Sequence, residues 1–294
     1  KKRKLVDIVS NPEFLREGEA IRDFIYPDRV VIGTDSKRAN RILKSLYLPI
    51  VKKTSRYFNT SRRGAELIKY ASNAFLATKI SYINELANLC EKTGVDIKDV
   101  SIGMGLDQRI GDRFLRAGPA YGGSCFPKDT KAIVDTANKF QTNLSIVKNV
   151  IKSNNDRKIL LSKRLEKLLN YKIINKKITF LGVTFKPNTD DMREASSLYM
   201  IPRLIKKGAI IRYFDPTGVK KEFANLKNVK SCKNIPSACY KSDLIVIHTE
   251  WNEFKLLNFK KIIKKNNFII YDLRNIYSPA KMLKNKIKYF AIGR

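Results

Sequence analysis

Ile178-Thr-Phe-Leu-Gly-Val183 begins the part of the chain that decides the fold. This apolar run has the length of a buried strand, and a helical pattern follows it over Ala195–Lys207. Gly208 ends that helix, and a second apolar run, Ala209–Phe214, predicts the next strand. Further strands are predicted at Asp243–His248, Phe268–Tyr271 and Lys288–Ala291. Strands that alternate with helices are typical of a parallel, doubly wound α/β sheet.

The first sixty residues show a shorter version of the same pattern. Short α/β pieces are predicted there: Leu5–Val9, a strand at Arg29–Gly33, a helix over Ser36–Ser45 and a strand at Pro49–Val51. A dinucleotide-binding domain should begin with a strand that runs into a G-x-G-x-x-G turn. The sequence contains no such turn.

The central part of the chain is helical. A long helix is predicted from about Ser61 to Thr93, where Gly94 ends it, and more helices follow to about residue 170. We therefore predict three domains, at residues 1–60, 61–170 and 171–294. The long helix carries one apolar stripe at steps of four and three residues, formed by Leu76, Ile80, Ile83, Ala87 and Cys90.

Extending this stripe backward leads to Asn73 and then Lys69. Polar side chains on a buried helix face need partners, and a desolvated lysine is a candidate for charge stabilisation or proton transfer. The alternative is a helix end that emerges into solvent. Glu13 and Glu17 are also four residues apart, and their charges could simply favour the first turn of a helix.

One cysteine lies in the stretch Gly118-Pro-Ala-Tyr-Gly-Gly-Ser-Cys-Phe-Pro-Lys-Asp-Thr130. Cys125 precedes a predicted helix start, where Pro127 suits the first turn and Asp129 or Thr130 could cap the helix. A helix N-terminus with Lys128 nearby stabilises a thiolate, which is the environment of a nucleophile. The alternative is a tight turn with an incidental buried cysteine.

The composition limits the classes of function. The 294 residues carry a net charge of +32, from 59 Lys and Arg against 27 Asp and Glu. Such a charge raises nucleic-acid binding as an alternative, but the basic residues are spread through every segment and no nucleic-acid motif accompanies them. We interpret the excess as compositional bias that also attracts anionic nucleotides, and we expect no specific nucleic-acid partner. We also expect no membrane span, no metal site and a cytosolic protein with reduced thiols.

Four blocks together resemble the UDP-glucose/GDP-mannose dehydrogenase family. They are the Cys125 stretch, Asn11-Pro-Glu-Phe-Leu-Arg-Glu-Gly18, the helix around Lys69 and Asn73, and Phe185-Lys-Pro-Asn-Thr-Asp-Asp-Met-Arg193. They follow the family's order and cover nearly the whole chain. The resemblance implies two Rossmann-like domains joined by a long central helix, through which a homodimer packs. It also implies four-electron oxidation of UDP-glucose to UDP-glucuronate, with NAD as cofactor.

Other members of the family oxidise GDP-mannose or UDP-N-acetylmannosamine, and these activities stay open. A non-catalytic dimer that binds UDP-sugar is a further alternative. The family carries its glycine-rich NAD turn in an N-terminal domain, so the resemblance implies that most of this domain is missing here. We therefore expect the chain alone to bind UDP-glucose or UDP, to bind NAD⁺ poorly and to show negligible turnover.

The resemblance also implies roles for single residues. Cys125 would hold the aldehyde as a thiohemiacetal and then as a thioester, while Lys69 and Asn73 would stabilise the oxyanions. Glu17 and Asp129 would be the carboxylates that assist water. Substrate contacts would come from Lys69, Asn73, Glu13, Phe14, Leu15, Arg16, Phe114, Leu115, Tyr121, Gly122 and Lys186, and from Arg109 across the subunit interface. Glu17, Lys128 and Arg193 would bind NAD. Ala120 departs from the family's pattern, which usually has glycine there.

Overall fold

The computed structural model describes residues 6–51, 56–263 and 265–294. They form two compact units. The first is the described part of Lys1–Phe75 together with Asp129–Asn143, and the second is Leu76–Lys128 together with the described part of Leu144–Arg294. The helices α3 (Arg62–Thr93) and α5 (Cys125–Lys139) contain residues of both units.

The first unit contains a small parallel sheet. Strand β1 (Val30–Gly33) pairs with β2 (Tyr57–Thr60), and helix α2 (Lys37–Val51) connects them. A short helix, α1 (Ala20–Ile25), precedes β1. Of the predicted Leu5–Val9 piece, Leu5 lies outside the described residues and residues 6–9 form no strand, although Ser10 bridges to Gly33.

The strand predicted at Pro49–Val51 is wrong, because these residues form the last turn of α2. Leu43, Tyr47 and Val51 recur every four residues and pack on β1 at Val30 and Ile32. This helical period continues through Pro49. Tertiary packing therefore overrides the helix-breaking tendency of a proline near the end of a helix.

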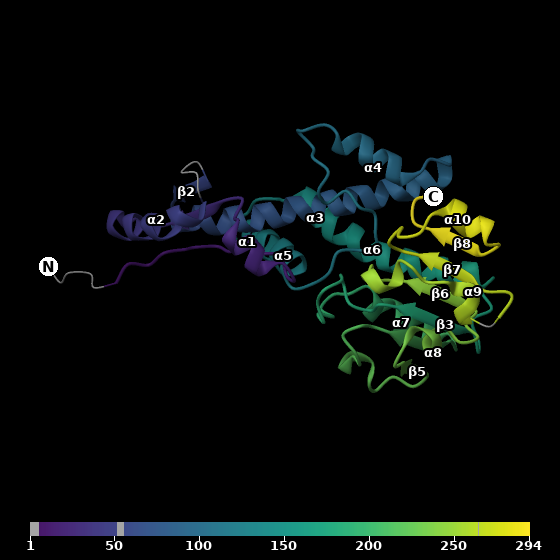
Figure 1. The fold of residues 1–294 in the computed structure, drawn as a ribbon. Coiled ribbons are helices and arrows are strands. Elements are labelled where there is room, and N and C mark those ends of the chain that lie inside the picture. The colour runs from purple at the N-terminus through teal and green to yellow at the C-terminus, as the bar shows by residue number, and fades with distance from the viewer. Residues whose placement is uncertain (1–5, 52–55, 264) are drawn as a thin grey trace. The chain divides into compact units, whose positions relative to one another are not determined.

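The second unit is built around a six-stranded parallel sheet. Its strands are β3 (Lys177–Leu181), β4 (Ile210–Phe214), β5 (Val229–Ser231), β6 (Leu244–Ile247), β7 (Ile269–Asp272) and β8 (Lys288–Ala291). Their order across the sheet is β5-β4-β3-β6-β7-β8, and Figure 1 shows β3, β6, β7 and β8 in green to yellow. Counted along this unit the order is 3-2-1-4-5-6, which is that of a Rossmann sheet. The strands predicted here from apolar runs are confirmed, whereas the short strands β2 and β5 were not predicted.

Helices cover both faces of this sheet. Alternate strand residues point to opposite faces, so Phe180 and Val246 pack with α6 (Ser145–Leu168) and α7 (Ser197–Lys206). Ile245 and Ile247 pack on the other face, which is covered by α8 (Ile235–Cys239), α9 (Phe259–Ile263) and α10 (Pro279–Lys284). Helix α4 (Ile97–Gly105) also belongs to this unit, as do short 3₁₀ turns at Lys221–Phe223 and Asn252–Phe254. The doubly wound α/β fold predicted from the sequence is confirmed.

One ion-pair cluster joins α6 to α7. The buried carboxylate of Glu166 accepts hydrogen bonds from Arg203 Nε at 2.9 Å and Lys207 Nζ at 2.8 Å. Burial alone would raise the pKa of Glu166, but the hydrogen bonds from Lys207 and Arg203 outweigh it and hold the pKa below its ordinary value.

A carboxyl pKa that is lower in the folded than in the unfolded state stabilises the fold above the unfolded pKa, and this stability is lost as the pH falls. Glu166→Gln should therefore lower the free energy of unfolding near pH 7 by about 1–3 kcal/mol. It should also flatten the acid side of the stability curve, measured by urea unfolding between pH 3 and 7. Asp156→Asn on the same helix, in an exposed pair with Lys152, is the matched control and should change little. Equal acid sensitivity of Glu166→Gln and the native protein would contradict this account.

Candidate active site

Cys125 is the first residue of α5, a helix of fifteen residues. The thiol is half-buried, and its sulfur lies 3.6 Å from Ser124 Oγ. The helix begins earlier than predicted, so Asp129 and Thr130 lie inside it, buried, and the predicted cap at either residue is wrong. The first four N–H groups of a helix have no partner within the helix, so Pro127 fits in this turn.

Two glycines ahead of Cys125 allow a close approach of backbone to protein. A Cβ on Gly122 would lie 2.8 Å from the carbonyl oxygen of Glu194 and 2.9 Å from Cβ of Phe185. Gly123 has φ +77°, and a Cβ there would lie 2.7 Å from the Phe185 ring. Gly123 N also donates to the carbonyl oxygen of Arg193 at 2.7 Å. The neighbour that lies too close for a side chain at either glycine is the chain's own 185–194 segment.

An aromatic cluster flanks the cysteine. Tyr121 packs edge-on to Phe126, with ring centroids 6.2 Å apart, and Phe114 lies 6.0 Å from Phe126. Leu115, the residue after Phe114 in the sequence, is buried. Ala120 has φ 157°, in a region that favours glycine, and it stands where the family pattern has glycine. The predicted substrate residues Phe114, Leu115, Tyr121 and Gly122 thus form one continuous, mostly buried segment.

The predicted nucleotide segment follows β3 at the carboxyl edge of the large sheet. Asp215, at the end of β4, accepts hydrogen bonds from Val183 N at 2.8 Å and Thr184 N at 3.4 Å. The Lys186 ammonium lies 5.4 Å from the centroid of the Phe185 ring. Arg193 is bound by Asp191. Doubly wound folds bind ligands at this edge, beside the strand where the order reverses.

Arg274 is a residue of this edge that sequence reasoning missed. It follows β7 and donates to the carbonyl oxygens of His248 at 2.8 Å and Phe185 at 2.7 Å, and it pairs with Glu250 at 2.9 Å. One guanidinium therefore links the loops after β3, β6 and β7. The signal in the sequence was an arginine directly after a strand, Asp272-Leu-Arg274, at the ligand-binding edge of a parallel sheet.

Lys69 of the first unit has the partners that its place on α3 demands. Its ammonium donates to the Glu13 carbonyl oxygen at 2.6 Å and to Glu13 Oε1 at 3.1 Å. It lies 5.4 Å from the centroid of the Phe14 ring, and the Arg29 guanidinium lies 4.0 Å from the same centroid. The lysine side chain is only 15% exposed, so the alternative of a solvated helix end does not hold here.

Asn73 is buried and donates to Asp129 Oδ2 at 2.6 Å. The 11–18 segment is not helical, so Glu13 and Glu17 do not share a helix face and their charges do not belong to a first helical turn. Leu15 N donates to Glu13 Oε2, and Arg16 is held by Asp23 and Glu19. Glu17 is exposed in the turn before α1.

Arg109, in the turn after α4, is 89% exposed and pairs with Asp107. Lys128 is exposed on α5. His248, directly after β6, has a structural role, because Ser196 and Thr249 hold its ring nitrogens. Burial lowers the pKa of His248 to about 3, with a smaller effect from Arg274. No cluster that could hold a metal occurs in the described part of the chain.

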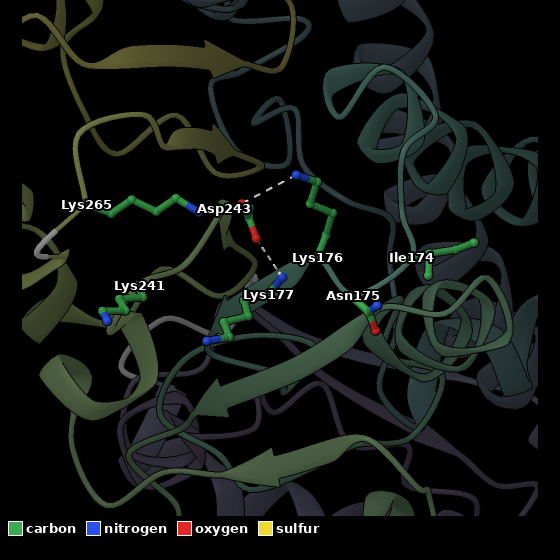
Figure 2. Close-up of a pocket in the computed structure, with 7 residues that line it drawn as sticks. All are labelled: Ile174, Asn175, Lys176, Lys177, Lys241, Asp243 and Lys265. Carbon is green, nitrogen blue, oxygen red and sulfur yellow. Dashed lines mark hydrogen bonds and ion pairs between the residues drawn. The ribbon is translucent and has the colours of Figure 1, made fainter.

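A cavity of about 470 Å³ lies at the opposite, amino edge of the large sheet. Figure 2 shows Lys176 and Lys265 directed toward Asp243 and Lys241 directed away from it. Lys265 Nζ lies 2.6 Å from Asp243 Oδ1, and Lys177 N donates to Asp243 Oδ2 at 2.8 Å. Lys241 and Lys265 follow the ends of α8 and α9, where cations are stabilised. Lys176 and Lys265 thus have a structural partner in Asp243, and the cavity is remote from the carboxyl edge of the sheet.

The fold and site together define an α/β protein with a Rossmann-type ligand-binding sheet and a cysteine at a helix N-terminus. Residues 63–156 match the central domain of the UDP-glucose/GDP-mannose dehydrogenase family, and residues 179–279 match its UDP binding domain. Residues 1–51 match its NAD binding domain. The chain belongs to the UDP-glucose/GDP-mannose dehydrogenase family.

Individual relatives agree with this assignment. A UDP-glucose 6-dehydrogenase of Rickettsia felis is 44% identical over 98% of this chain, and so is the UDP-glucose 6-dehydrogenase YwqF of Bacillus subtilis. A solved UDP-glucose dehydrogenase of Pyrobaculum islandicum superposes on 97% of the chain with a TM-score of 0.85 and 34% identity. The chain spans 65% of the length of both bacterial relatives and 63% of that solved chain.

The match over residues 1–51 supports NAD as the cofactor. It gives no support to the expectation that most of the NAD-binding domain is missing from the protein. No helix in the described ranges has the length and apolar character needed to cross a membrane.

Gly122 offers a direct test of the close approach in the cysteine loop. Gly122→Ala should lower the free energy of unfolding by about 1–3 kcal/mol, because the new methyl group would meet the backbone of Glu194. Gly103→Ala is the matched control, since Gly103 is exposed on α4 and has nothing within 4 Å of an added Cβ. The control should be neutral or stabilising by up to about 1 kcal/mol. Equal denaturation midpoints for the two variants would mean that the backbone at Gly122 does not pack tightly against Glu194.

Proposed function

We propose that the protein is an NAD-dependent UDP-glucose 6-dehydrogenase that oxidises the sugar's primary alcohol to a carboxylate. The observation that carries the proposal is Cys125, half-buried at the N-terminus of α5 and joined to a buried loop. The names of its relatives, UDP-glucose 6-dehydrogenases, support UDP-glucose over GDP-mannose or UDP-N-acetylmannosamine. Bound NAD⁺ supplies the oxidant that accepts a hydride in each of the two oxidation steps.

Cys125 does the covalent work. Its thiolate adds to the aldehyde carbon and forms a C–S bond, which gives a thiohemiacetal. The thiohemiacetal carbon then loses its hydrogen with the electron pair, as a hydride, and the hydroxyl group loses its proton, which gives a thioester. Water then attacks the thioester carbonyl, the C–S bond breaks, and the carboxylate leaves while the thiolate is restored. Without such a nucleophile the aldehyde would not be held between the two oxidation steps.

Lys69 and Asn73 would stabilise the oxyanions of the two tetrahedral species. They lie one turn apart on α3, so both can direct N–H donors to one oxygen. The Lys69–Glu13 and Asn73–Asp129 hydrogen bonds support this role, because they fix both donors in place. Asp129 and Glu17 would assist the attacking water.

The nucleotide would lie against the carboxyl edge of the large sheet, as the match to the UDP binding domain supports. Lys186 would bind the diphosphate, and Phe114, Leu115, Tyr121 and Gly122 would line the sugar nucleotide, with Glu13, Phe14, Leu15 and Arg16. Of the residues that would hold NAD, the sequence contains Glu17, Lys128 and Arg193 but no G-x-G-x-x-G turn. In this proposal the domain limits are 1–60, 61–170 and 171–294.

The protein would act as a homodimer that packs through α3. Four apolar side chains on this helix recur at steps of seven or eight residues and are each more than half exposed: Leu67, Phe75, Tyr82 and Leu89. An apolar stripe of this kind marks an interface. Arg109 is exposed in a turn, which suits a residue donated to the site of the partner subunit.

Cys125→Ser should lower kcat by on the order of 10²–10³-fold, the cost of removing a covalent or oxyanion element. Formation of NADH at saturating UDP-glucose measures this. Cys232→Ser is the control, because Cys232 is a half-buried thiol after β5, outside the proposed site. Near-normal turnover of Cys125→Ser would remove Cys125 from the mechanism.

The donation of Arg109 across the interface is tested by mixing two inactive variants. Arg109→Ala and Cys125→Ala subunits, mixed in equal amounts, should recover about a quarter of native activity, because half of the dimers are then mixed and each holds one intact site. Native mass spectrometry verifies subunit exchange. Verified mixed dimers without activity would show that Arg109 acts within its own subunit or not at all.

A further inference from the structure

The loop that leads to Cys125 is buried although it has no regular secondary structure. Residues 117, 118, 119, 121, 122 and 123 are all buried. Loops usually run over the surface, because each buried backbone N–H and C=O needs a partner. This loop therefore depends on side chains of neighbouring helices for its backbone hydrogen bonds.

Asn154 of α6 acts on the loop at Tyr121. Its Oδ1 accepts from Tyr121 N at 2.9 Å, and its Nδ2 donates to the Tyr121 carbonyl oxygen at 3.0 Å. The carboxamide thus pairs with both polar groups of one residue, as a neighbouring strand would. Asn154 is 5% exposed, so water has little access to replace these bonds.

Arg157, one turn further along α6, acts on the loop at Gly118. Its Nε donates to the Gly118 carbonyl oxygen at 2.6 Å and its Nη1 to the Asn84 carbonyl oxygen at 2.9 Å. The Asn84 side chain accepts in turn from Gly118 N at 2.8 Å. Both backbone groups of Gly118 are therefore held, one from α6 and one from α3.

Burying the charged side chain of Arg157 to hold the loop costs free energy. Burial lowers its pKa to about 10, which still leaves it charged at neutral pH. Its hydrogen-bond partners in the described part of the chain are two backbone carbonyls and Asn88 Oδ1, not a carboxylate. A buried charge without a direct ion pair costs free energy. We infer that Arg157 is retained because its hydrogen bonds fix the backbone of the loop.

The restraint reaches the cysteine by a short route. Tyr121 packs on Phe126, the residue after Cys125, and both belong to one apolar cluster with Val150 of α6. Gly123, two residues before Cys125, is fixed to the Arg193 carbonyl oxygen. The backbone between Gly118 and Cys125 is thus tied at three successive points.

We propose that Asn154 and Arg157 are positioning residues that fix the Cys125 loop and keep the thiol in its reactive place at the start of α5. The proposal rests on the proposed nucleophilic role of Cys125. Neither residue touches the substrate. They act by occupying the hydrogen-bonding groups of Gly118 and Tyr121 that a mobile loop would leave to water.

Asn154→Asp is the sharpest test, because it is nearly isosteric. The carboxylate still accepts from Tyr121 N but faces the Tyr121 carbonyl oxygen with a second acceptor. Asn155→Asp, the same change on the exposed neighbouring residue, is the matched control. Asn84→Asp keeps the acceptor for Gly118 N, so it should lose far less activity than Asn154→Asp.

Two readouts separate positioning from folding. In folded protein, kcat of Asn154→Asp should fall on the order of 10²-fold, while the control stays at the native value. Alkylation of Cys125 by iodoacetamide, followed by peptide mass spectrometry, should slow on the order of tenfold. The half-buried Cys232 in the same molecules is the internal reference and should not change. If Asn154→Asp does not fold, Asn154→Ala avoids the repulsion and is subject to the same two measurements.

The proposal is overturned if a folded Asn154 variant shows native kcat and a native ratio of Cys125 to Cys232 alkylation. The alkylation ratio needs no turnover, so it tests the loop even if Cys125 is not the nucleophile. Conversely, an active Cys125→Ser enzyme would refute the proposed function without deciding the restraint on the loop.

Discussion

Irregular backbone buried inside a protein must find a partner for each of its polar groups, and the loop from Ala117 to Gly123 is subject to this constraint. Its partners come from α3, from α6 and from the 185–194 segment. The glycines at 122 and 123 are required because that segment lies too close for a side chain. One loop thus ties the helical region to the ligand-binding edge of the sheet within the second unit, and Cys125 follows it directly.

Polar groups at the two opposite edges of the large sheet also have partners within the protein. At the carboxyl edge, Asp215 and Arg274 form hydrogen bonds with backbone groups of the loops after the strands, and these bonds fix the shape of the loops. At the amino edge, lysines neutralise Asp243 and helix ends. The charged groups at both edges therefore hold loops and strand ends in place.

Much of the fold was accessible from the sequence because it rests on periodicity. Apolar runs predicted β3, β4, β6 and β7, and the stripe on α3 pointed to the burial of Asn73 and the partial burial of Lys69. Local propensity failed where packing decides. Pro49 remains helical because Val51 completes a packed face, and α5 starts at Cys125 although Asp129 and Thr130 are better caps.

Partners of polar groups were not accessible from the sequence. The pairing of Asn154 with Tyr121, of Asn73 with Asp129 and of Arg274 with Phe185 joins residues 33 to 89 positions apart. No periodicity encodes such pairs. The pattern of a helix alone does not distinguish an asparagine that binds a neighbouring loop from one on the surface. The roles of the site residues stay predictions for the same reason.

In the proposed reaction Cys125 carries the substrate covalently, and trapping of the adduct is the decisive experiment. The Cys125→Ser protein is incubated with UDP-glucose and NAD⁺, quenched in acid and digested. The mass of the peptide that contains position 125 is then measured by mass spectrometry. We expect a UDP-glucuronyl ester on this peptide, because an ester is hydrolysed more slowly than a thioester. Continued formation of NADH with this peptide unmodified, or an adduct on another residue, would contradict it.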